Sequence, residues 1–272
     1  MRDSRSLGGG CINRAMTISD GARACFVKAN QAGMLPMFEA EAEALAEMAA
    51  TDTLRVPRPI CQGVTGGQAY LVLEYLDLRG SINMAQFGQQ LAAMHRVVQS
   101  RFGWHRDNAI GATPQSNSLQ ADWIAFWRQQ RLGFQLELAA VNGYGSELQK
   151  PGQQLLERFP VLFDGYQPQA SMLHGDLWSG NAGALSDGTP VIFDPGFYYG
   201  DRECDIAMTE LFGGFGGRFY AAYNEAWPLD AGYKTRKTLY NLYHILNHLN
   251  MFGGGYQSQA LDMMRRLLAE VS

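Results

Sequence analysis

Alternating apolar and polar positions in the first third of the chain predict two pairs of short antiparallel strands. Residues 15–18 and 24–28 form the first pair, and residues 60–64 and 69–73 form the second. An Asp-Gly turn separates the strands of the first pair and a Gly-Gly turn those of the second, as is typical of β-hairpins. Between the pairs, residues 36–50 have the apolar spacing of an amphipathic helix with Pro in its first turn.

Helical periodicity dominates the rest of the chain, and Ser81 or Asn83 is a suitable N-cap for the first helix. Two short apolar runs, residues 171–173 and 191–193, are expected to be strands, with a tight turn at residues 186–188 between them. The helices expected from the apolar spacing cover residues 83–98, 122–141, 146–159, 206–212, 219–227, 234–252 and 257–271.

Length and composition predict a soluble globular protein with one large domain or two lobes. The chain has 272 residues, of which 46% are hydrophobic and 18% are charged. Its net charge of -4 argues against a nucleic-acid partner, which would need a basic surface. No apolar run approaches the roughly 20 residues of a membrane span, so no membrane partner is expected. The first residues also lack the apolar core of a secretory signal.

The cysteines indicate a reducing compartment. Cys11, Cys25, Cys61 and Cys204 are scattered, and none forms the Cys-x-x-Cys pair of zinc sites or thioredoxin-like proteins. Scattered cysteines without framework spacing fit a reducing cytosol. We therefore expect a cytoplasmic location.

The candidate chemistry centres on residues 174–181, His-Gly-Asp-Leu-Trp-Ser-Gly-Asn, followed by Asp194-Pro195-Gly196. A carboxylate, an amide five residues later and a second carboxylate suit phosphoryl transfer. Asp176 would accept the proton of an attacking hydroxyl, while Asn181 and Asp194 would hold a metal ion on the nucleotide phosphates. The alternative is structural, because Asp and Asn are common in turns, where they bond their own backbone.

The N-terminal region offers further groups for a nucleotide. Glycines such as Gly9 and Gly10, before the first hairpin, let backbone amides approach phosphate oxygens, and Lys28 at a strand end could reach them as a point charge. Glu41 lies on the same face of the helix as the apolar stripe, so its side chain starts from the side that faces the core. We expect it to pair with Lys28. The alternative readings are a glycine-rich terminus and a solvated lysine.

Other acids of the same helix are expected to differ from Glu41. Glu39 and Glu43 are predicted to be solvated. Their place in the first half of the helix is explained by a favourable interaction between acidic side chains and the helix macrodipole. In the later loop of residues 101–111, aromatic and charged residues are mixed. Its aromatics either pack on a neighbouring helix, or Trp104 or Asp107 faces a substrate.

The strand that ends at residue 74 leads into Glu74-Tyr75-Leu76. This sequence of an acid, an aromatic residue and a leucine follows a strand and precedes a helix, which is the position of the hinge in a kinase. The carbonyl of Glu74 and the amide of Leu76 could then pair with adenine. Because these contacts are made by the main chain, the side chains specify them only by position.

Several stretches in order along the chain together resemble the fructosamine (ketosamine) kinases. The His-Gly-Asp-Leu-Trp-Ser-Gly-Asn run and the later Tyr-Tyr-Gly-Asp-Arg-Glu run are typical of that family rather than of kinases at large. The match extends from about Gly8 to the C-terminus. The stretches that carry it are residues 9–13, 26–28, 37–41, 111–117, 174–181, 199–212 and 240–255.

The resemblance implies an α+β, bilobal, protein-kinase-like fold. A small antiparallel β lobe with one helix would cover residues 1–76 and bind the nucleotide, and a larger, mainly helical catalytic and substrate lobe would cover residues 77–272. It also implies ATP- and Mg²⁺-dependent phosphorylation of the sugar 3-hydroxyl of ketosamines, such as fructosamine or ribulosamine adducts of a protein lysine. Such an activity belongs to deglycation and protein repair.

The resemblance also assigns roles to single residues. Asp176 would be the base, Asn181 and Asp194 the magnesium ligands, and Trp178 the sugar contact. Asp205 would brace the catalytic loop, whereas its spacing alone suggests a helix cap. Lys28 with Glu41 would position the phosphates, beside the nucleotide contacts from Gly9, Gly10, Glu74 and Leu76.

The N-terminus departs from the family pattern. Members usually carry a helix and a first strand before the glycine-rich loop, and only seven residues precede Gly8 here. The first strand and helix are thus shortened, or another segment fills the sheet edge. An open edge invites pairing, so a homodimer through this edge is a hypothesis. Cys11, beside phosphate-binding amides, could cross-link it or sense oxidation.

Two alternative functions stay open from the sequence. One is a kinase of the same fold that acts on an aminoglycoside or an amino alcohol. The other is a catalytically silent nucleotide-binding protein. The sequence specifies neither the preferred ketosamine sugar nor whether its carrier is a protein or a free amine.

Overall fold

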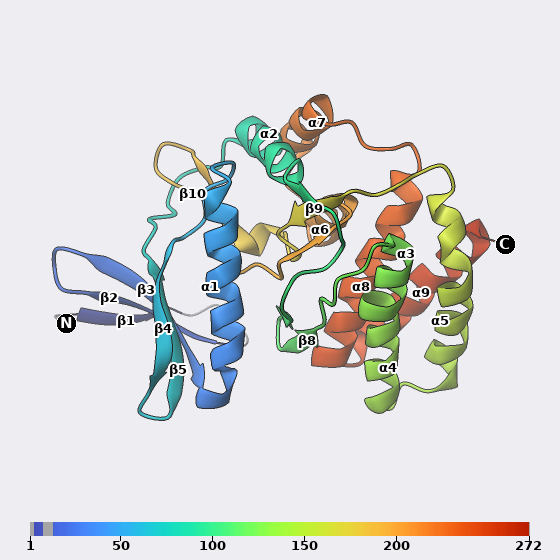
Figure 1. The fold of residues 1–272 in the computed structure, drawn as a ribbon, viewed down its shortest axis with the longest axis horizontal. Coiled ribbons are helices and arrows are strands. Elements are labelled where there is room, and N and C mark those ends of the chain that lie inside the picture. Colours follow the sequence, from blue (N-terminus) through green and yellow to red (C-terminus); the bar gives the residue numbers. More distant parts are fainter. Residues whose placement is uncertain (1–2, 8–12, 272) are drawn as a thin grey trace.

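The computed structural model describes residues 3–7 and 13–271. The chain folds into a small lobe built around an antiparallel sheet and a larger, mainly helical lobe (Figure 1). The α+β arrangement predicted from the resemblance is therefore confirmed. The sheet has the strand order β1-β2-β3-β5-β4. Its strands are β1 (Asp3–Leu7), β2 (Arg14–Ser19), β3 (Ala24–Gln31), β4 (Pro59–Thr65) and β5 (Gln68–Glu74).

Strand β1 occupies the sheet edge beside β2. The two strands are antiparallel, with Leu7 opposite Ala15. The edge of β2, which the sequence left open for pairing with a second copy, is therefore paired within the chain. Gly9, Gly10 and Cys11 lie outside the described residues, so the phosphate-loop and thiol predictions stay predictions.

Helix α1 (Leu35–Ala50) lies between the sheet and the larger lobe (Figure 1). Its apolar stripe, including Phe38, Leu45 and Met48, is buried as the spacing predicts. Glu41 is on the same buried side, with 8% of its surface exposed. The helix thus presents one carboxylate to the interior of the small lobe.

The outward acids of α1 are partly exposed, and one of them also contacts the larger lobe. Glu43 accepts hydrogen bonds from Arg106 Nη1 (2.8 Å) and pairs with His105 Nε2 (2.6 Å) in the larger lobe. The Arg106 hydrogen bond lowers the pKa of Glu43. Glu39 keeps a half-exposed side chain, 3.7 Å from Arg106. The Glu39 and Glu43 side chains are 42% and 40% exposed, so both keep contact with solvent as expected, but the periodicity of one helix does not reveal the partners of Glu43 in the larger lobe.

After β5 the chain enters the larger lobe through α2 (Met84–His95). The Asn83 side chain accepts a hydrogen bond from Gln86 N (3.2 Å), so Asn83 is its N-cap. The helix ends at His95, three residues earlier than expected. Val98–Gln99 forms the short strand β6 instead, because it pairs with a strand from the centre of the lobe.

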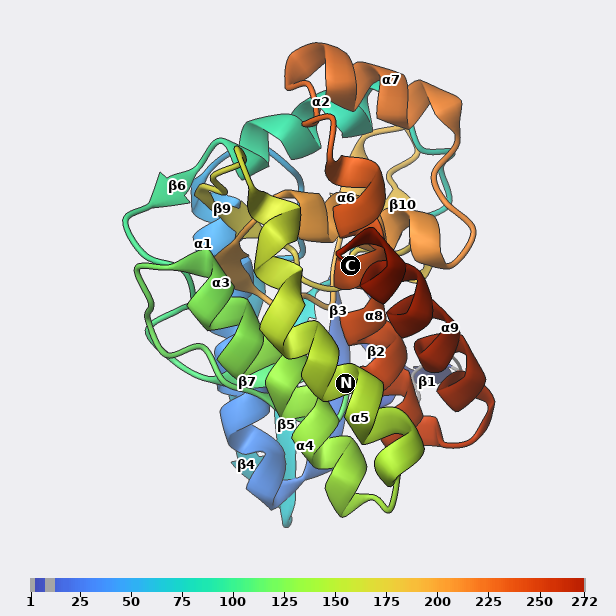
Figure 2. The same ribbon diagram turned by 90° about the vertical axis from the view of Figure 1, so that its right-hand side faces the viewer.

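The helices of the larger lobe pack around α2 on one side and α8 on the other (Figures 1 and 2). Helix α2 approaches α7 so closely that a Cβ on Gly88 would lie 2.3 Å from the Phe219 carbonyl oxygen. Helices α4, α5 and α9 gather around α8 at the far end (Figure 2). The helices that follow α2 are α3 (Trp123–Phe126), α4 (Phe134–Val141), α5 (Ser146–Arg158), α6 (Glu203–Leu211), α7 (Gly217–Ala226), α8 (Tyr233–Phe252) and α9 (Gly255–Glu270).

One expected helix, at residues 122–141, contains a π-helical segment at Trp127–Gly133 between α3 and α4. Arg131 in this segment is fully buried, with its guanidinium 4.1 Å from the centre of the Tyr198 ring. Arg131 Nη2 also donates to Asn117 Oδ1 (2.7 Å). An apolar repeat of 3.6 residues does not reveal such a segment, which re-aims side chains without ending the helix.

Short strands in the larger lobe frame the segment with the candidate chemistry. Strand β9 (Ala170–Leu173) pairs with β6 and with β12 (Tyr198–Gly200), and not with residues 191–193. The tight turn at residues 186–188 joins β10 (Ala182–Ala184) to β11 (Pro190–Ile192). A further hairpin, β7 (Asn108–Ile110) with β8 (Thr113–Gln115), lies beside α1.

Among the residues that the structure describes, no helix is long and apolar enough to cross a membrane.

Candidate active site

The loop after β9 is anchored by one buried carboxylate, that of Asp205. Its two oxygens accept hydrogen bonds from the backbone amides of His174 (2.7 Å) and Gly175 (2.8 Å). His95 Nε2 lies 3.1 Å from the same group. Burial alone would raise the pKa of Asp205, but the hydrogen bonds from the His95 side chain and the Gly175 amide lower it below its usual value. Asp205 lies inside the first turn of α6, so it is no N-cap; the brace implied by the resemblance is the arrangement observed.

Gly175 brings this loop against the segment that carries Asp194. Its φ is +81°, in the left-handed region that favours glycine. A Cβ at this position would lie 2.0 Å from the Gly196 carbonyl oxygen. Only glycine therefore allows the two backbones to touch, which explains why a residue with a side chain is absent here.

Asp176 is held by groups on both sides of the loop. Asn181 Nδ2 donates to the Asp176 backbone carbonyl (2.8 Å) and to its Oδ2 (3.1 Å). Burial raises the pKa of Asp176 to about 7, with a further increase from the Asp205 charge, while the Asn181 hydrogen bond opposes both. A carboxylate with this pKa can accept a proton near neutral pH.

His174 shapes the loop as a neutral side chain. Burial lowers its pKa, and its Nε2 lies 2.9 Å from the Phe193 carbonyl oxygen. A neutral ring that donates from Nε2 has Nδ1 free to accept from the backbone amide of Asp176, at 3.2 Å. His174 thus connects the loop before Asp176 to the strand end before Asp194.

Lys28 joins the two lobes at this point. Its Nζ forms ion pairs with Glu41 Oε1 (2.6 Å) in the small lobe and with Asp194 Oδ1 in the larger lobe. Lys28 is 6% exposed, whereas the Asp194 side chain is 51% exposed. The structure therefore brings together the lysine, the helix acid and the second carboxylate that the sequence singled out.

Asn181 and Asp194 have the donor chemistry of a magnesium site. The Asn181 NH₂ group is used by Asp176, which leaves its amide oxygen as the free end of the side chain. The backbone amide of Phe193 donates to the Asn181 carbonyl (3.1 Å), so Asn181 is fixed beside the residue that precedes Asp194. Asp194 has a φ of 61°, which Asp tolerates better than most residues. Carboxylate and amide oxygens are hard ligands that suit Mg²⁺.

Trp178 stands at the exposed side of the loop, with 37% of its surface accessible. Its ring is 6.2 Å from that of Phe212, which lies 5.1 Å from His248, and His248 lies 5.6 Å from Phe252. Phe252 is 55% exposed. These four rings form a continuous series of aromatic contacts that begins at Trp178. The sequence pointed to Trp178 alone, because the other three come from distant helix ends.

The predicted hinge contacts are main-chain groups next to a structural side chain. Glu74 Oε1 accepts from Arg55 Nη2 (2.5 Å) and Oε2 from the Arg58 amide (3.2 Å), so this carboxylate holds the sheet edge. Leu76 follows directly after β5, where the chain leaves the small lobe. Trp104 is 3% exposed, so it does not face a substrate, and Asp107 accepts from the Asn117 amide (2.8 Å).

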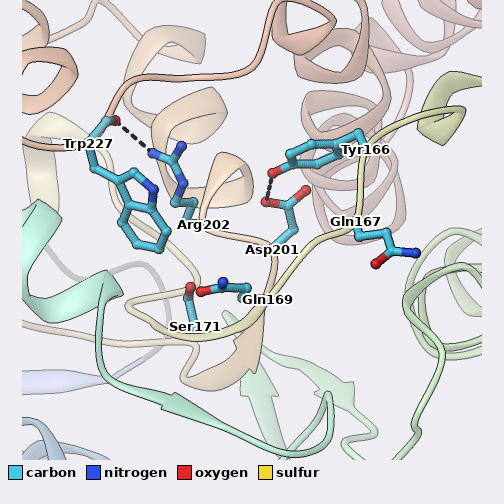
Figure 3. Close-up of a pocket in the computed structure, with 7 residues that line it drawn as sticks. All are labelled: Tyr166, Gln167, Gln169, Ser171, Asp201, Arg202 and Trp227. Atoms are coloured by element: carbon cyan, nitrogen blue, oxygen red, sulfur yellow. Dashed lines mark hydrogen bonds between the residues drawn. The ribbon is translucent and has the colours of Figure 1, made fainter.

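A polar pocket of about 150 Å³ lies beside β9 and the start of α6 (Figure 3). Tyr166 donates to Asp201 Oδ1 (2.9 Å), and Arg202 Nη1 donates to the Trp227 carbonyl (3.0 Å). Burial raises the pKa of Asp201. These contacts fix the N-terminus of α6, which presents Asp205 to the loop. The sequence showed this run of acids but no signal of their partners.

Known proteins resemble the whole chain. The family model for fructosamine kinase matches residues 1–270. A probable ketoamine kinase of Synechocystis sp. is 49% identical over 271 residues, which cover 98% of this chain and 91% of that protein. A chloroplastic protein-ribulosamine 3-kinase of Arabidopsis thaliana is 44% identical over 264 residues, covering 95% and 80%.

Solved structures agree with this picture. The crystal structure of a candidate fructosamine-3-kinase from Haemophilus somnus superposes with a TM-score of 0.90 and 30% identity, over 98% of this chain and 91% of that one. An ADP-bound aminoglycoside phosphotransferase has a TM-score of 0.65 at 12% identity, over 98% and 94%. The second likeness shows that the fold is shared with that wider group.

Proposed function

Because this chain belongs to the fructosamine kinase family, we propose that it transfers the γ-phosphoryl group of ATP to the 3-hydroxyl of a ketosamine sugar. The relatives named ketoamine kinase and protein-ribulosamine 3-kinase support this reaction. The observation that carries it is the cluster of Asp176, Asn181, Asp194 and Lys28, which come from both lobes and meet at one place. Deglycation of amines is the process that such a reaction serves.

Asp176 is the proton acceptor in this proposal. The sugar hydroxyl gives its proton to the Asp176 carboxylate as its oxygen forms the new bond to phosphorus, and the bond between phosphorus and the ADP oxygen breaks. A pKa of about 7 suits that task, since the carboxylate is largely ionised above neutral pH and still basic enough to take a proton. Asn181 keeps the carboxylate oriented through its hydrogen bond (3.1 Å).

Lys28 and Glu41 position the nucleotide phosphates, and Asn181 and Asp194 would hold Mg²⁺. When bound, the ion would neutralise charge on the phosphate oxygens. Glu41 holds the Lys28 ammonium through their ion pair. When the nucleotide binds, Lys28 can exchange its contact with Asp194 for a contact with a phosphate.

The other proposed contacts are those to adenine, to the phosphates and to the sugar. The Glu74 carbonyl and the Leu76 amide would pair with adenine, and the amides of Gly9 and Gly10 would cover the phosphates. Trp178 would stack on the sugar, and its exposed position two residues after Asp176 in the chain supports this role. The nucleotide lobe would then cover residues 1–76 and the catalytic lobe residues 77–272. A cytoplasmic location fits the scattered cysteines.

Two alternatives are disfavoured by specific observations. A kinase for aminoglycosides or amino alcohols shares the fold, but the relatives with 49% and 44% identity carry ketoamine and ribulosamine names. A silent nucleotide-binding protein would tolerate loss of the base or the metal ligands, but all of these groups are present, with Asp176 bonded to Asn181 and Asp194 paired with Lys28.

An ATP-consumption assay over a small substrate panel tests the proposal. The panel contains ribulosamine, fructosamine and erythrulosamine derivatives of one carrier amine, the same amine without sugar, an aminoglycoside and an amino alcohol. Turnover of at least one ketosamine, with none for the bare amine, is expected. Turnover of the aminoglycoside or amino alcohol alone would replace this function with the first alternative.

A further inference from the structure

One side of α1 faces the larger lobe through acids spaced four residues apart, Glu39, Glu43 and Glu47. Residues at this spacing lie on one face of a helix. Glu43 pairs with Arg106 and His105, as described above, and these contacts are at the surface. Glu47 is partly buried, as Glu39 and Glu43 are, but its partners differ.

Glu47 accepts two hydrogen bonds from neutral donors. Trp104 Nε1 donates to its Oε2 (3.0 Å), and Tyr199 Oη donates to its Oε1 (2.8 Å). Both donors are nearly buried, at 3% and 6% exposure. Burial raises the pKa of Tyr199, and the hydrogen bond to Glu47 adds to the rise, so the phenol stays a donor. Charged acceptors make the stronger class of hydrogen bond.

Tyr199 belongs to the segment that follows Asp194 in the chain, and Trp104 packs against that segment. Tyr199 is on β12, and its amide donates to the Gly103 carbonyl (2.9 Å). The Trp104 ring packs on Phe197 at 5.0 Å, and Phe197 lies 5.6 Å from Tyr199. The hairpin β7–β8 holds the same segment.

The hairpin contacts are direct. Gln115 Nε2 donates to the Gly196 carbonyl (3.0 Å), and Asn108 Nδ2 donates to the Phe197 carbonyl (2.7 Å). The segment after Asp194 is thus fixed by the larger lobe before it meets Glu47. The Glu47 carboxylate on α1 therefore accepts hydrogen bonds from Trp104 and Tyr199, and the larger lobe holds the segment of Tyr199 in place.

We propose that Glu47 is a positioning residue for phosphoryl transfer, which locks α1 onto the segment that follows Asp194 and so keeps Glu41 paired with Lys28. This inference rests on the proposed function. Glu47 lies six positions after Glu41 on the same helix, so a shift of α1 at Glu47 moves Glu41 as well. The lock is made by Trp104 and Tyr199, without any modified residue.

The lock explains how this chain keeps its helix in place. In protein kinases, the position of the corresponding helix is controlled by phosphorylation of an activation loop. Here only residues 195–202 lie between Asp194 and α6, and three of them form β12. No activation loop lies between Asp194 and α6. The hydrogen bonds of Glu47 hold α1 in its place instead.

Tyr199→Phe is the mildest test, because it removes one hydrogen bond and keeps the ring. We expect kcat with a ketosamine to fall about tenfold, the affinity for ATP to weaken by a similar factor, and the KM for the ketosamine to stay within twofold. Glu47→Gln should give the same pattern, since one of its two acceptor atoms becomes a donor. Melting curves of each variant report folding.

Two matched variants separate positioning from stability. Glu39→Gln makes the same charge change on the same helix at a pair 3.7 Å long, and its rates should stay within twofold of wild type. In a Glu41→Gln background, Tyr199→Phe should cost less than twofold more, because the pair it supports is already lost.

The opposite results would overturn the inference. Unchanged kcat and ATP affinity in Tyr199→Phe, or a full tenfold cost on top of Glu41→Gln, would show that Glu47 does not act through the Lys28 pair. If the wild-type protein bound ATP but turned over no ketosamine, the proposed function would fail separately. The ATP-affinity comparison would still decide the role of Glu47.

Discussion

At the scale of single residues, the candidate base owes its properties to what surrounds it. Asp176 is enclosed by the loop and lies near the buried charge of Asp205, and both raise its pKa to about 7. The hydrogen bond from the Asn181 side chain opposes this rise. His174 stays neutral because burial lowers its pKa. One titrating group therefore dominates the acid–base behaviour expected of the loop.

The raised pKa predicts opposite effects of pH on rate and on stability. Between about pH 4 and 7, folded Asp176 keeps a proton that the unfolded chain has released, so the native state is stabilised at low pH and loses this contribution as pH rises through 7. Asp176→Asn should therefore melt about 2–4 °C above wild type at pH 8, and this gain should shrink steadily from pH 7 towards 4.

The wild-type rate should rise as the carboxylate ionises, with its acid limb near pH 7. Melting curves from pH 4 to 8 and kcat/KM over the same range are the measurements. A melting difference independent of pH, or an acid limb near pH 4, would mean that Asp176 has an ordinary pKa.

At the scale of elements, the site depends on backbone segments that touch. Strand β9 delivers the loop, α6 braces it through Asp205, and Gly175 lets it meet Gly196. The hairpin β10–β11 brings Asn181 back beside Phe193. Each element is short, and the active geometry comes from their contacts rather than from any single one.

Gly175→Ala is predicted to be severe. The added methyl would need φ to leave +81° or the Gly196 carbonyl to move, from a starting distance of 2.0 Å. We expect a loss of roughly 2 kcal/mol or more in the free energy of unfolding, and at least a hundredfold loss of turnover. Denaturant titration and the kinase assay measure both.

Gly165→Ala provides the matched control. It also has a positive φ, of +77°, but nothing lies within 4 Å of the added carbon. It should lose about 1 kcal/mol in the free energy of unfolding and keep its turnover. Equal losses of turnover at the two positions would show that the backbone contact with Gly196 is not what matters.

The sequence predicted these elements well where local chemistry defines them. The hairpin turns, the Asn83 cap and the stripe of α1 follow from short-range rules. It failed for the end of α2, which stops early because residues 98–99 join β9, and it did not reveal the distant partner Arg106 of Glu43. The π-helical segment at Trp127–Gly133 has no periodicity signal.

The site divides in the same way. Asp176, Asn181, Asp194 and Lys28 were identifiable because phosphoryl transfer needs these groups in a known order. The aromatic partners of Trp178 and the donors to Glu47 were not, because single aromatics far apart in the chain carry no mark of their meeting in space.

At the scale of the whole molecule, the two lobes are connected at the centre of the site by Lys28. This side chain crosses from β3 to Asp194, while Glu41 holds it from α1. Binding of a nucleotide between the lobes would add contacts to both. The folded protein should therefore be stabilised by ATP in proportion to its affinity.

Lys28→Met should reduce that stabilisation. The variant keeps the length of the side chain but loses the charge that meets the phosphates, and we expect the ATP affinity to fall at least tenfold. The melting temperature of wild type should rise with Mg²⁺-ATP, and that of the variant much less. An equal rise in both proteins would contradict the assigned role. Lys150→Met, on α5 and outside the site, is the control.

The central claim is that Asp176 accepts the proton of a ketosamine hydroxyl as this hydroxyl attacks ATP. Phosphorus NMR tests this claim most directly. A peptide that carries a ribulose-modified lysine is incubated with Mg²⁺-ATP and either wild type or Asp176→Asn. We predict that wild type forms ADP and a new phosphate monoester signal coupled to the proton on C3 of the sugar, whereas Asp176→Asn binds ATP but forms at least a hundredfold less product. Equal product with both proteins, or a phosphate at another position, would contradict the account.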